Sequence, residues 1–416
     1  ARYWTMAGHR AVERSANLEA IQHLLKALDV SAELPPSPDR RQQEVDLLMT
    51  LGSAYTATKG FGALEVEQTS QRVRDLCRNM GEARRARPAL QGLRVLYMVR
   101  GDLDAAAALG EELLREGGGS PLHRFEGETA LGVVDVFGGR LKSAVDRLER
   151  ARGLADHARQ VSLVQQPTGS LEVVCLGPLS GALYLTGYPE RSSELRAEAL
   201  RIARTYAHPF TLAQALGCTS NINAVRRLAT DLETASELLA IAEEHSFDFW
   251  KAWGRAWCGW ARVNAGEPEN GLGELRQSLA EAEAMGAEMI AAQILVPLAT
   301  TLGRVDKIEE ARALLERQRH TAARTGIRFW DSLVHVADAE LLRAGPKPDW
   351  GAIEAALEKA IIVARSQNSR MLELRAARDL ARLWAERGEQ RRALDLLSPV
   401  YAWFTEGFDT PDLVDA

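Results

Sequence analysis

The stretch LQGLRVLYMVRGDLDAA, residues 90–106, contains the pattern that decides the fold. Leu90 and Tyr97 lie two helical turns apart and share one helix face with Leu93. Gly101 tolerates the positive φ that ends a helix, and Ala106, five positions later, is small enough to let a second helix pack closely. The stretch therefore predicts two antiparallel helices that are joined by a tight turn.

The same spacing of a turn residue and a small residue recurs along the chain. The pairs are Ser15/Ala20, Gly101/Ala106, Gly139/Ala144, Gly187/Ser192, Thr230/Ala235, Gly266/Gly271, Asp306/Ala311 and Gly388/Ala393. Neighbouring pairs are separated by roughly 40 residues, somewhat more than the ~34 of the tetratricopeptide repeat. Two wider intervals each have room for one more hairpin, with longer turns near Gly60 and Gly345.

Composition favours an all-α fold. Aromatic residues make up only 6% of the chain, and runs of Val, Ile or Thr that would indicate strands are rare. A hydrophobic content of 46% is enough for a large core. We expect a tetratricopeptide-like helical-repeat solenoid, a right-handed superhelix of about ten helical hairpins, which forms a single domain over residues 1–416.

The widest interval between turns contains a polar, helix-breaking stretch, QQPTGS at residues 165–170. This stretch predicts a loop over residues 162–172, either a simple connector or a protruding loop with a role of its own. It also marks residues 157–172 as the place where the array could divide into two bodies.

Charge and hydropathy exclude several classes of partner. The net charge of −6 comes from 57 acidic and 51 basic residues that are mixed along the chain, so there is no basic stripe for nucleic acid. No stretch approaches the ~18 apolar residues of a membrane span, and the N-terminus has no signal-peptide pattern. We expect a cytoplasmic protein that binds neither nucleic acid nor membrane.

No catalytic signature of the common kinds occurs: the sequence has no GxxxxGK[ST] phosphate loop, no HExxH motif and no GxSxG turn. The histidines are dispersed and the cysteines form no CxxC pair, so no metal site is indicated. We therefore expect no catalytic residue, cofactor or metal in this chain. The cysteines, which we expect to be buried and reduced, are Cys77, Cys175, Cys218 and Cys258.

The aromatic residues give the best candidates for a binding site. They concentrate in one expected helix, where four tryptophans share a face, and a Phe-Trp pair repeats the pattern two hairpins later. These rings either fill the seam between hairpins or line an inner groove and stack on a peptide or small ligand. The candidate groove residues are Trp250, Trp253, Trp257, Trp260, Phe329 and Trp330.

Several segments carry a more specific likeness. The most specific is the tail LLSPVYAWFTEGFDTPDL at residues 396–413, and the others are ARYW at 1–4, SANLEAI at 15–21, ATKGF at 57–61, LTGYP at 185–189 and HPF at 208–210. In these segments the chain resembles the C-terminal helical-repeat region of bacterial multidomain proteins. Those proteins place a class III adenylate/guanylate cyclase domain before an AAA-type, STAND-like ATPase module. Around residues 165–167 the sequence departs from that pattern.

The resemblance implies a parent protein that is a nucleotide cyclase or a cyclase-like ATPase regulator. The chain begins at Ala1 rather than Met and ends at Ala416, so we expect a segment of such a longer protein. No position matches the cyclase metal-binding aspartates or the ATPase phosphate loop, so any catalysis would lie outside this chain.

Three functions remain open. The first is a non-catalytic scaffold or sensor that binds a protein or peptide in its groove, or binds the parent's own ATPase module. The second is a small-molecule inducer domain, like the helical-repeat sensors of bacterial transcription activators, with the tryptophan region as its pocket. The third is a structural oligomerisation arm.

Overall fold

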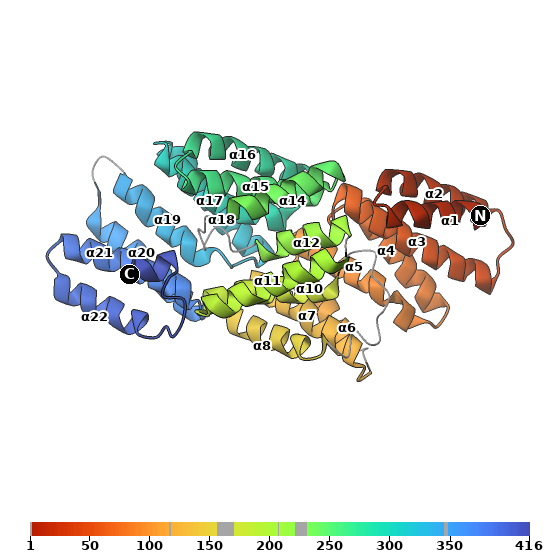
Figure 1. Ribbon diagram of the computed structural model, residues 1–416, viewed down its shortest axis with the longest axis horizontal. Coiled ribbons are helices and arrows are strands. Elements are labelled where there is room, and N and C mark those ends of the chain that lie inside the picture. Colours follow the sequence, from red (N-terminus) through yellow and green to blue (C-terminus); the bar gives the residue numbers. More distant parts are fainter. Residues whose placement is uncertain (1, 116–117, 156–169, 207, 221–230, 345–347) are drawn as a thin grey trace.

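The computed structural model consists of α-helices that pair into hairpins (Figure 1). It describes residues 2–416 except 116–117, 156–169, 207, 221–230 and 345–347. Within these ranges no residue is in a strand, and ten helix pairs are present. The expected all-helical solenoid of about ten hairpins is therefore confirmed.

Each hairpin consists of a first helix and a second helix. The first helices are α1 (Arg2–Glu13), α3 (Pro38–Lys59), α5 (Arg87–Val99), α7 (Pro121–Phe137), α10 (Leu171–Thr186), α12 (Pro209–Thr219), α15 (Asp248–Asn264), α17 (Glu288–Arg304), α19 (Asp331–Ala344) and α21 (Arg370–Glu386). The second helices are α2 (Asn17–Ala32), α4 (Leu64–Asn79), α6 (Leu103–Arg115), α8 (Leu141–Arg152), α11 (Pro189–Tyr206), α14 (Asp231–Glu244), α16 (Pro268–Ala284), α18 (Ile308–Thr325), α20 (Trp350–Ser366) and α22 (Gln390–Tyr401). A short 3₁₀ helix, η1 (Ala83–Ala86), precedes α5, and α23 (Pro411–Val414) lies at the C-terminus.

The turns inside the hairpins form as the spacing predicts. Gly101 has a φ of 77°, and Ala106 is completely buried against the first helix. Positive φ angles also occur at Ser15, Gly139, Gly187, Gly266, Asp306 and Gly388, whereas Thr230 lies outside the described residues. The small residue five positions after each turn is buried because the two helices meet there.

The first helices form the inside of the molecule. Consecutive first helices contact each other along the series α7, α10, α12, α15, α17, α19 and α21. They are accordingly buried on almost all sides, as in α17 from Met289 to Ala299. The second helices bury one face only, as α18 does through Ala311 and Leu315. The molecule is thus an inner layer of first helices covered by an outer layer of second helices.

Hairpins far apart in the sequence also lie side by side. Helix α3 contacts α15, α5 contacts α17, and α10 contacts α21, so the superhelix closes on itself after about five hairpins. In Figure 1 the first hairpins lie at the right, the last ones at the left, and α7, α10 and α12 lie between them. The inner space is therefore filled in large part by first helices from both halves of the chain.

Turns of the first half contact turns of the second half, and we call this set of contacts the turn seam. A side-chain carbon at Gly101 would lie 2.6 Å from Cγ2 of Thr325. The backbone N–H groups of Arg328 and Phe329 donate hydrogen bonds to the carbonyl of Phe137, at 2.9 and 3.2 Å. The full seam comprises the turns 60–62, 101–103, 137–139 and 187–190 on one side and 285–288, 325–329, 367–370 and 403–407 on the other.

The expected loop over residues 162–172 falls mainly outside the described residues, as does most of the expected break near residues 157–172. Where the structure resumes, Ser170 caps α10 by accepting a hydrogen bond from the N–H of Val173 at 3.5 Å. Residues 171 and 172 are therefore helical and do not belong to a loop.

Candidate functional site

The tryptophan face of α15 lies in the interior. Trp250, Trp253 and Trp257 are each no more than 5% exposed, and the ring centroids of neighbours along this face are 6.3 and 6.5 Å apart. The indole N–H of Trp253 donates to the hydroxyl of Ser220 at 3.0 Å, which satisfies a buried polar group. These three rings fill the seam between α12 and α15, so the structure gives them a packing role.

A turn from the first half of the chain contributes to this seam. Phe61, between α3 and α4, lies with its ring centroid 5.0 Å from that of Phe249 and 6.1 Å from that of Trp250, both edge to face. Phe210 and Phe247 complete the group, at 5.2 Å from each other. We call these five residues the aromatic cluster, and they join the two halves of the molecule at the turn seam.

Trp260 and Trp330 differ from the other predicted residues because they line a pocket. This inner pocket lies between the first helices α15, α17, α19 and α21 and has a volume of about 70 Å³. Phe329, which precedes Trp330, is instead buried at the turn seam. The pocket is lined by Trp260, Val296, Pro297, Thr300, Arg304, Trp330, Leu333, Val336, Ala337, Glu340, Arg375, Arg378 and Asp379.

Two residues of the inner pocket contain buried hydrogen-bond donors without a described partner. The indole Nε1 atoms of Trp260 and Trp330 are buried and have no hydrogen-bond partner among the described residues. Arg304 is exposed, and its guanidinium lies 5.6 Å from the ring centroid of Trp260, close enough for a cation–π contact. The lining contains three arginines and two carboxylates, Glu340 and Asp379, so positive groups outnumber negative ones. With its apolar walls the pocket suits the carboxylate or carbonyl oxygen of a ligand.

Arginines of α21 extend this surface toward the C-terminus. Arg375 makes two hydrogen bonds to the carboxylate of Asp412, at 2.7 and 3.1 Å, and Asp412 is only 1% exposed. Arg378 pairs with the adjacent Asp379 at 2.8 Å and also approaches Asp412 at 3.5 Å and Asp415 at 3.3 Å. Burial lowers the pKa of Arg375, but the charge of Asp412 outweighs it and the pKa is raised. The arginine face, Arg375 and Arg378, thus holds an acidic residue of the chain's own tail.

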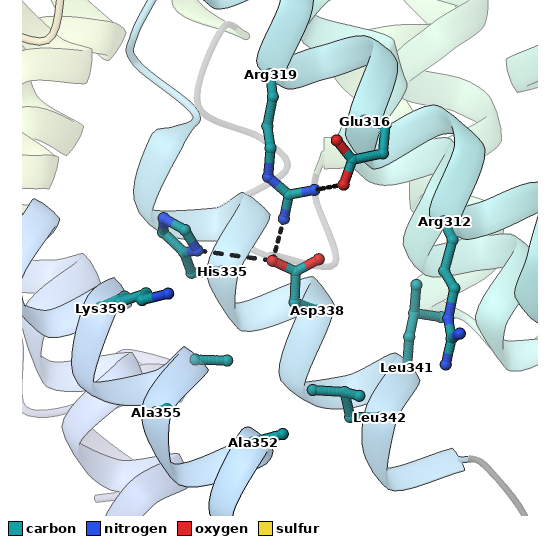
Figure 2. Close-up of a pocket in the computed structure, with 11 residues that line it drawn as sticks. Arg312, Glu316, Arg319, His335, Asp338, Leu341, Leu342, Ala352, Ala355 and Lys359 are labelled. Carbon is teal, nitrogen blue, oxygen red and sulfur yellow. Dashed lines mark hydrogen bonds and ion pairs between the residues drawn. The ribbon is translucent and has the colours of Figure 1, made fainter.

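A second pocket lies on the side of the second helices (Figure 2). It is bounded by α18, α19 and α20 and has a volume of about 670 Å³. Its lining combines ionisable groups with small and apolar ones: Arg312, Glu316, Arg319, His335, Asp338, Leu341, Leu342, Ala352, Ala355, Ala356 and Lys359. We call it the outer pocket, and sequence analysis gave no indication of it.

Sequence analysis also missed the arginines of the inner pocket and of the arginine face. Arg375 and Arg378 lie three residues apart on a first helix, where most positions are apolar, and the tail contains Asp412 and Asp415. Buried arginines on an inward face require acidic partners, so this spacing could have pointed to the contact. Arg304 gave no such signal, because a single arginine near a helix end is common.

The cysteines are free thiols, as expected, and three of them, Cys77, Cys175 and Cys258, are buried, whereas Cys218 is half-buried. Burial raises the pKa of Cys175 to about 12 and that of Cys258 to about 11. Over the described part of the chain, no three His, Cys, Asp or Glu side chains group together in a way that could hold a metal ion. Among those residues, too, no helix has the length and apolar character to cross a membrane.

No family model matches the chain. It is 25% identical over 392 residues to an uncharacterized protein of Rhizobium meliloti (strain 1021), a match that covers 91% of this chain and 37% of that protein. The chain thus spans little more than a third of the length of this relative.

Two solved structures have a similar fold. One is a Rap protein complexed with Competence and Sporulation Factor, with a TM-score of 0.54, 12% identity and 97% of both chains covered. The other is the Rap conjugation gene regulator of the plasmid pLS20 in complex with the Phr* peptide, with a TM-score of 0.53 and 13% identity, covering 86% of this chain and 94% of that one. Together with its ten hairpins, this likeness establishes that the chain has a tetratricopeptide-like helical-repeat fold.

Proposed function

We propose that this chain is a non-catalytic binding module that takes an acidic peptide segment on its inner surface, at the inner pocket and the arginine face. The observation that carries this proposal is the burial of Asp412 between Arg375 and Arg378. An acidic residue of the short C-terminal helix α23 already occupies part of this surface, which is the chemistry that a partner peptide would present.

The inner pocket beside it supplies the remaining contacts. Arg304 would pair with a second acidic residue, and the unpartnered indole N–H groups of Trp260 and Trp330 would donate to carbonyl or carboxylate oxygens. A pocket of about 70 Å³ has room for the end of one side chain and not for a whole small molecule. The two Rap structures were solved with a factor or a peptide bound, which supports a peptide ligand.

The larger context is part of the proposal. We infer that the chain belongs to a signalling protein of the nucleotide cyclase and ATPase type, where it acts in the cytoplasm as the sensor for a partner or for the parent's own ATPase module. The relative from Rhizobium meliloti is much longer than this chain, as such a parent would be. A small-molecule sensor is the second candidate, because the outer pocket, at about 670 Å³, has the size of a ligand site.

The test is binding of the purified chain to an array of synthetic peptides that vary in acidic and apolar residues. We expect retention of peptides that carry an acidic residue next to an apolar one, and at least a tenfold loss in Arg304→Glu, since the reversed charge would repel the carboxylate. Lys142→Glu, an exposed substitution on α8, is the matched control. Equal binding by Arg304→Glu, or no preference for acidic peptides, would contradict the proposal.

A further inference from the structure

The outer pocket lies between two second helices that no ion pair joins in the described part of the chain, whereas ion pairs join the second helices on either side of this step. Arg276 of α16 pairs with Glu310 of α18, at 2.6 Å. Arg392 of α22 likewise pairs with Glu354 of α20, at 2.8 Å. Between α18 and α20 the described residues make no such pair, and the outer pocket lies between these two helices.

The charged residues of α18 explain why no ion pair between described residues joins this helix to α20, because they pair with other residues. Arg319 of α18 points inward and pairs with Asp338 of α19, whose carboxylate also lies 3.6 Å from Nδ1 of His335 (Figure 2). Burial raises the pKa of Asp338, but the contacts with His335 and Arg319 outweigh this effect and lower it, so the carboxylate is ionised and neutralises Arg319. The other carboxylate of the lining, Glu316, also pairs with Arg319, at 2.5 Å, and neither carboxylate forms an ion pair with the cation of α20.

That cation is Lys359. Figure 2 shows its side chain directed toward α19, at the same end of the pocket as His335. It is exposed and forms no ion pair with any residue that the structure describes. At the other end, Arg312 has only a distant contact of 3.6 Å with the exposed Glu309. Lys359 is therefore the cation of this pocket that no described carboxylate neutralises, whereas Arg312 pairs with Glu309 and Arg319 pairs with Glu316 and Asp338.

The rest of the wall is apolar and recessed. Ala352, Ala355 and Ala356 lie on one face of α20, where longer side chains would fill the space. Leu341 and Leu342 of α19 form the floor beside them. A ligand that fits must therefore bring an anionic group and an aliphatic body, and the volume of about 670 Å³ is that of a small-molecule site.

We propose that the outer pocket binds a small amphiphilic carboxylate, with its carboxylate against Lys359 and its aliphatic body over Ala352, Ala355 and Leu342. The ligand's carboxylate takes the place that a glutamate occupies at the neighbouring steps of the outer layer. This site is separate from the inner pocket and does not depend on the proposed peptide binding. Because α18 bounds the outer pocket together with α19 and α20, the ligand would lie between two hairpins whose first helices, α17 and α19, line the inner pocket.

The experiment is isothermal titration of the whole chain with sodium octanoate as the probe, and with octanol and octylammonium as probes without the negative charge. We expect saturable binding of octanoate only. Lys359→Glu should weaken it at least tenfold by charge reversal, and Ala355→Leu should weaken it at least tenfold by filling the recess. Lys142→Glu, outside the pocket, should bind as the wild type does.

Three results would overturn the inference. The first is no octanoate binding at millimolar concentration. The second is an affinity for octanoate in Lys359→Glu and Ala355→Leu that equals that of the wild type. The third is octanol binding as tightly as octanoate. The inference would also be overturned if an acidic peptide bound instead of octanoate and if Lys359→Glu abolished that peptide binding. This result would assign the pocket to a protein partner. The peptide array with Arg304→Glu reports on the inner pocket alone, so the two proposals fail independently.

Discussion

At the scale of single residues, close helix packing depends on a few positions that lack a side chain. Gly259 of α15 and Gly271 of α16 face each other, and a side-chain carbon at Gly271 would lie 2.4 Å from the carbonyl oxygen of Gly259. Gly273, on the same helix, is exposed and has open space around it. The two glycines of α16 therefore have opposite structural consequences.

We predict that Gly271→Ala lowers the free energy of unfolding by about 1–3 kcal/mol, because α15 and α16 must move apart. Gly273→Ala should raise it by about 0.5–1 kcal/mol, because alanine favours the helix without meeting any neighbour. Urea denaturation of both variants measures the two effects. If both variants changed the free energy of unfolding equally and in the same direction, the close approach of α15 and α16 at Gly271 would be contradicted.

A second prediction concerns the thiols. Because burial raises the pKa of Cys175 to about 12 and of Cys258 to about 11, only about one thiol in a thousand or fewer is ionised at pH 8. Iodoacetamide should leave both residues of the folded protein unmodified at pH 8, as measured by mass spectrometry. Unfolding in guanidinium should make all four cysteines reactive. Stoichiometric labelling of Cys175 in the folded state would contradict this prediction.

Residue-level expectations were accurate where the physics is local. A glycine or a short polar residue followed by a small residue specifies a turn and a close helix contact within a few positions, so Gly101, Ser15 and Asp306 were all found from the sequence. Whether a ring on an inward face meets a neighbour or an open pocket depends on the next helices. The sequence therefore grouped Trp253 with Trp260, although only Trp260 lines the inner pocket.

At the scale of elements, the turn between α3 and α4 is held by the aromatic cluster. Phe61 contacts Phe210, Phe249 and Trp250, from helices that begin far later in the sequence. Its ring thereby connects the second hairpin to the sixth and seventh. This contact does not follow from helical periodicity, which describes only neighbours along one helix.

We predict that Phe61→Ala lowers the free energy of unfolding by about 2–3 kcal/mol, because removal of this half-buried ring leaves a cavity among its neighbours. Phe408→Ala is the matched control and should change it by no more than about 0.5 kcal/mol, because Phe408 is 49% exposed. Hydrogen exchange should accelerate in Phe61→Ala at the end of α3 and at the start of α15. Acceleration confined to α3 would argue that the cluster does not join the halves.

At the scale of the whole molecule, the turn seam makes the two halves depend on each other. In an open solenoid each repeat contacts only its neighbours, and parts of the array can unfold separately. In this chain α3, α5 and α10 contact α15, α17 and α21, so that loss of one half removes buried surface from the other.

We predict a single cooperative unfolding transition in urea. Far-UV circular dichroism reports on all helices, whereas tryptophan fluorescence reports mainly on the second half, where Trp250, Trp253, Trp257, Trp260 and Trp330 are buried. The two signals should have the same midpoint. Two transitions by circular dichroism, only one of them seen by fluorescence, would mean that the first half unfolds independently.

The whole-molecule arrangement was the least predictable from the sequence. The repeat gave the hairpins and their approximate number, but the curvature of a superhelix results from small rotations at each step, which accumulate over about five hairpins. The contact of Gly101 with Thr325 depends on that accumulated curvature. The two pockets depend instead on how the side chains of consecutive hairpins pack, which helical periodicity does not describe.

The turn seam also limits how this fold can change during evolution. Repeat arrays ordinarily lengthen or shorten by duplication or loss of a unit, because the neighbours of the altered repeat are all that must adapt. In this chain the turn at residues 101–103 contacts residues 325–329, and the turn at 137–139 contacts both 325–329 and 367–370. One hairpin gained or lost between them would place each turn opposite the wrong partner. We therefore expect divergence in loop lengths and surface residues, with the number of repeats unchanged.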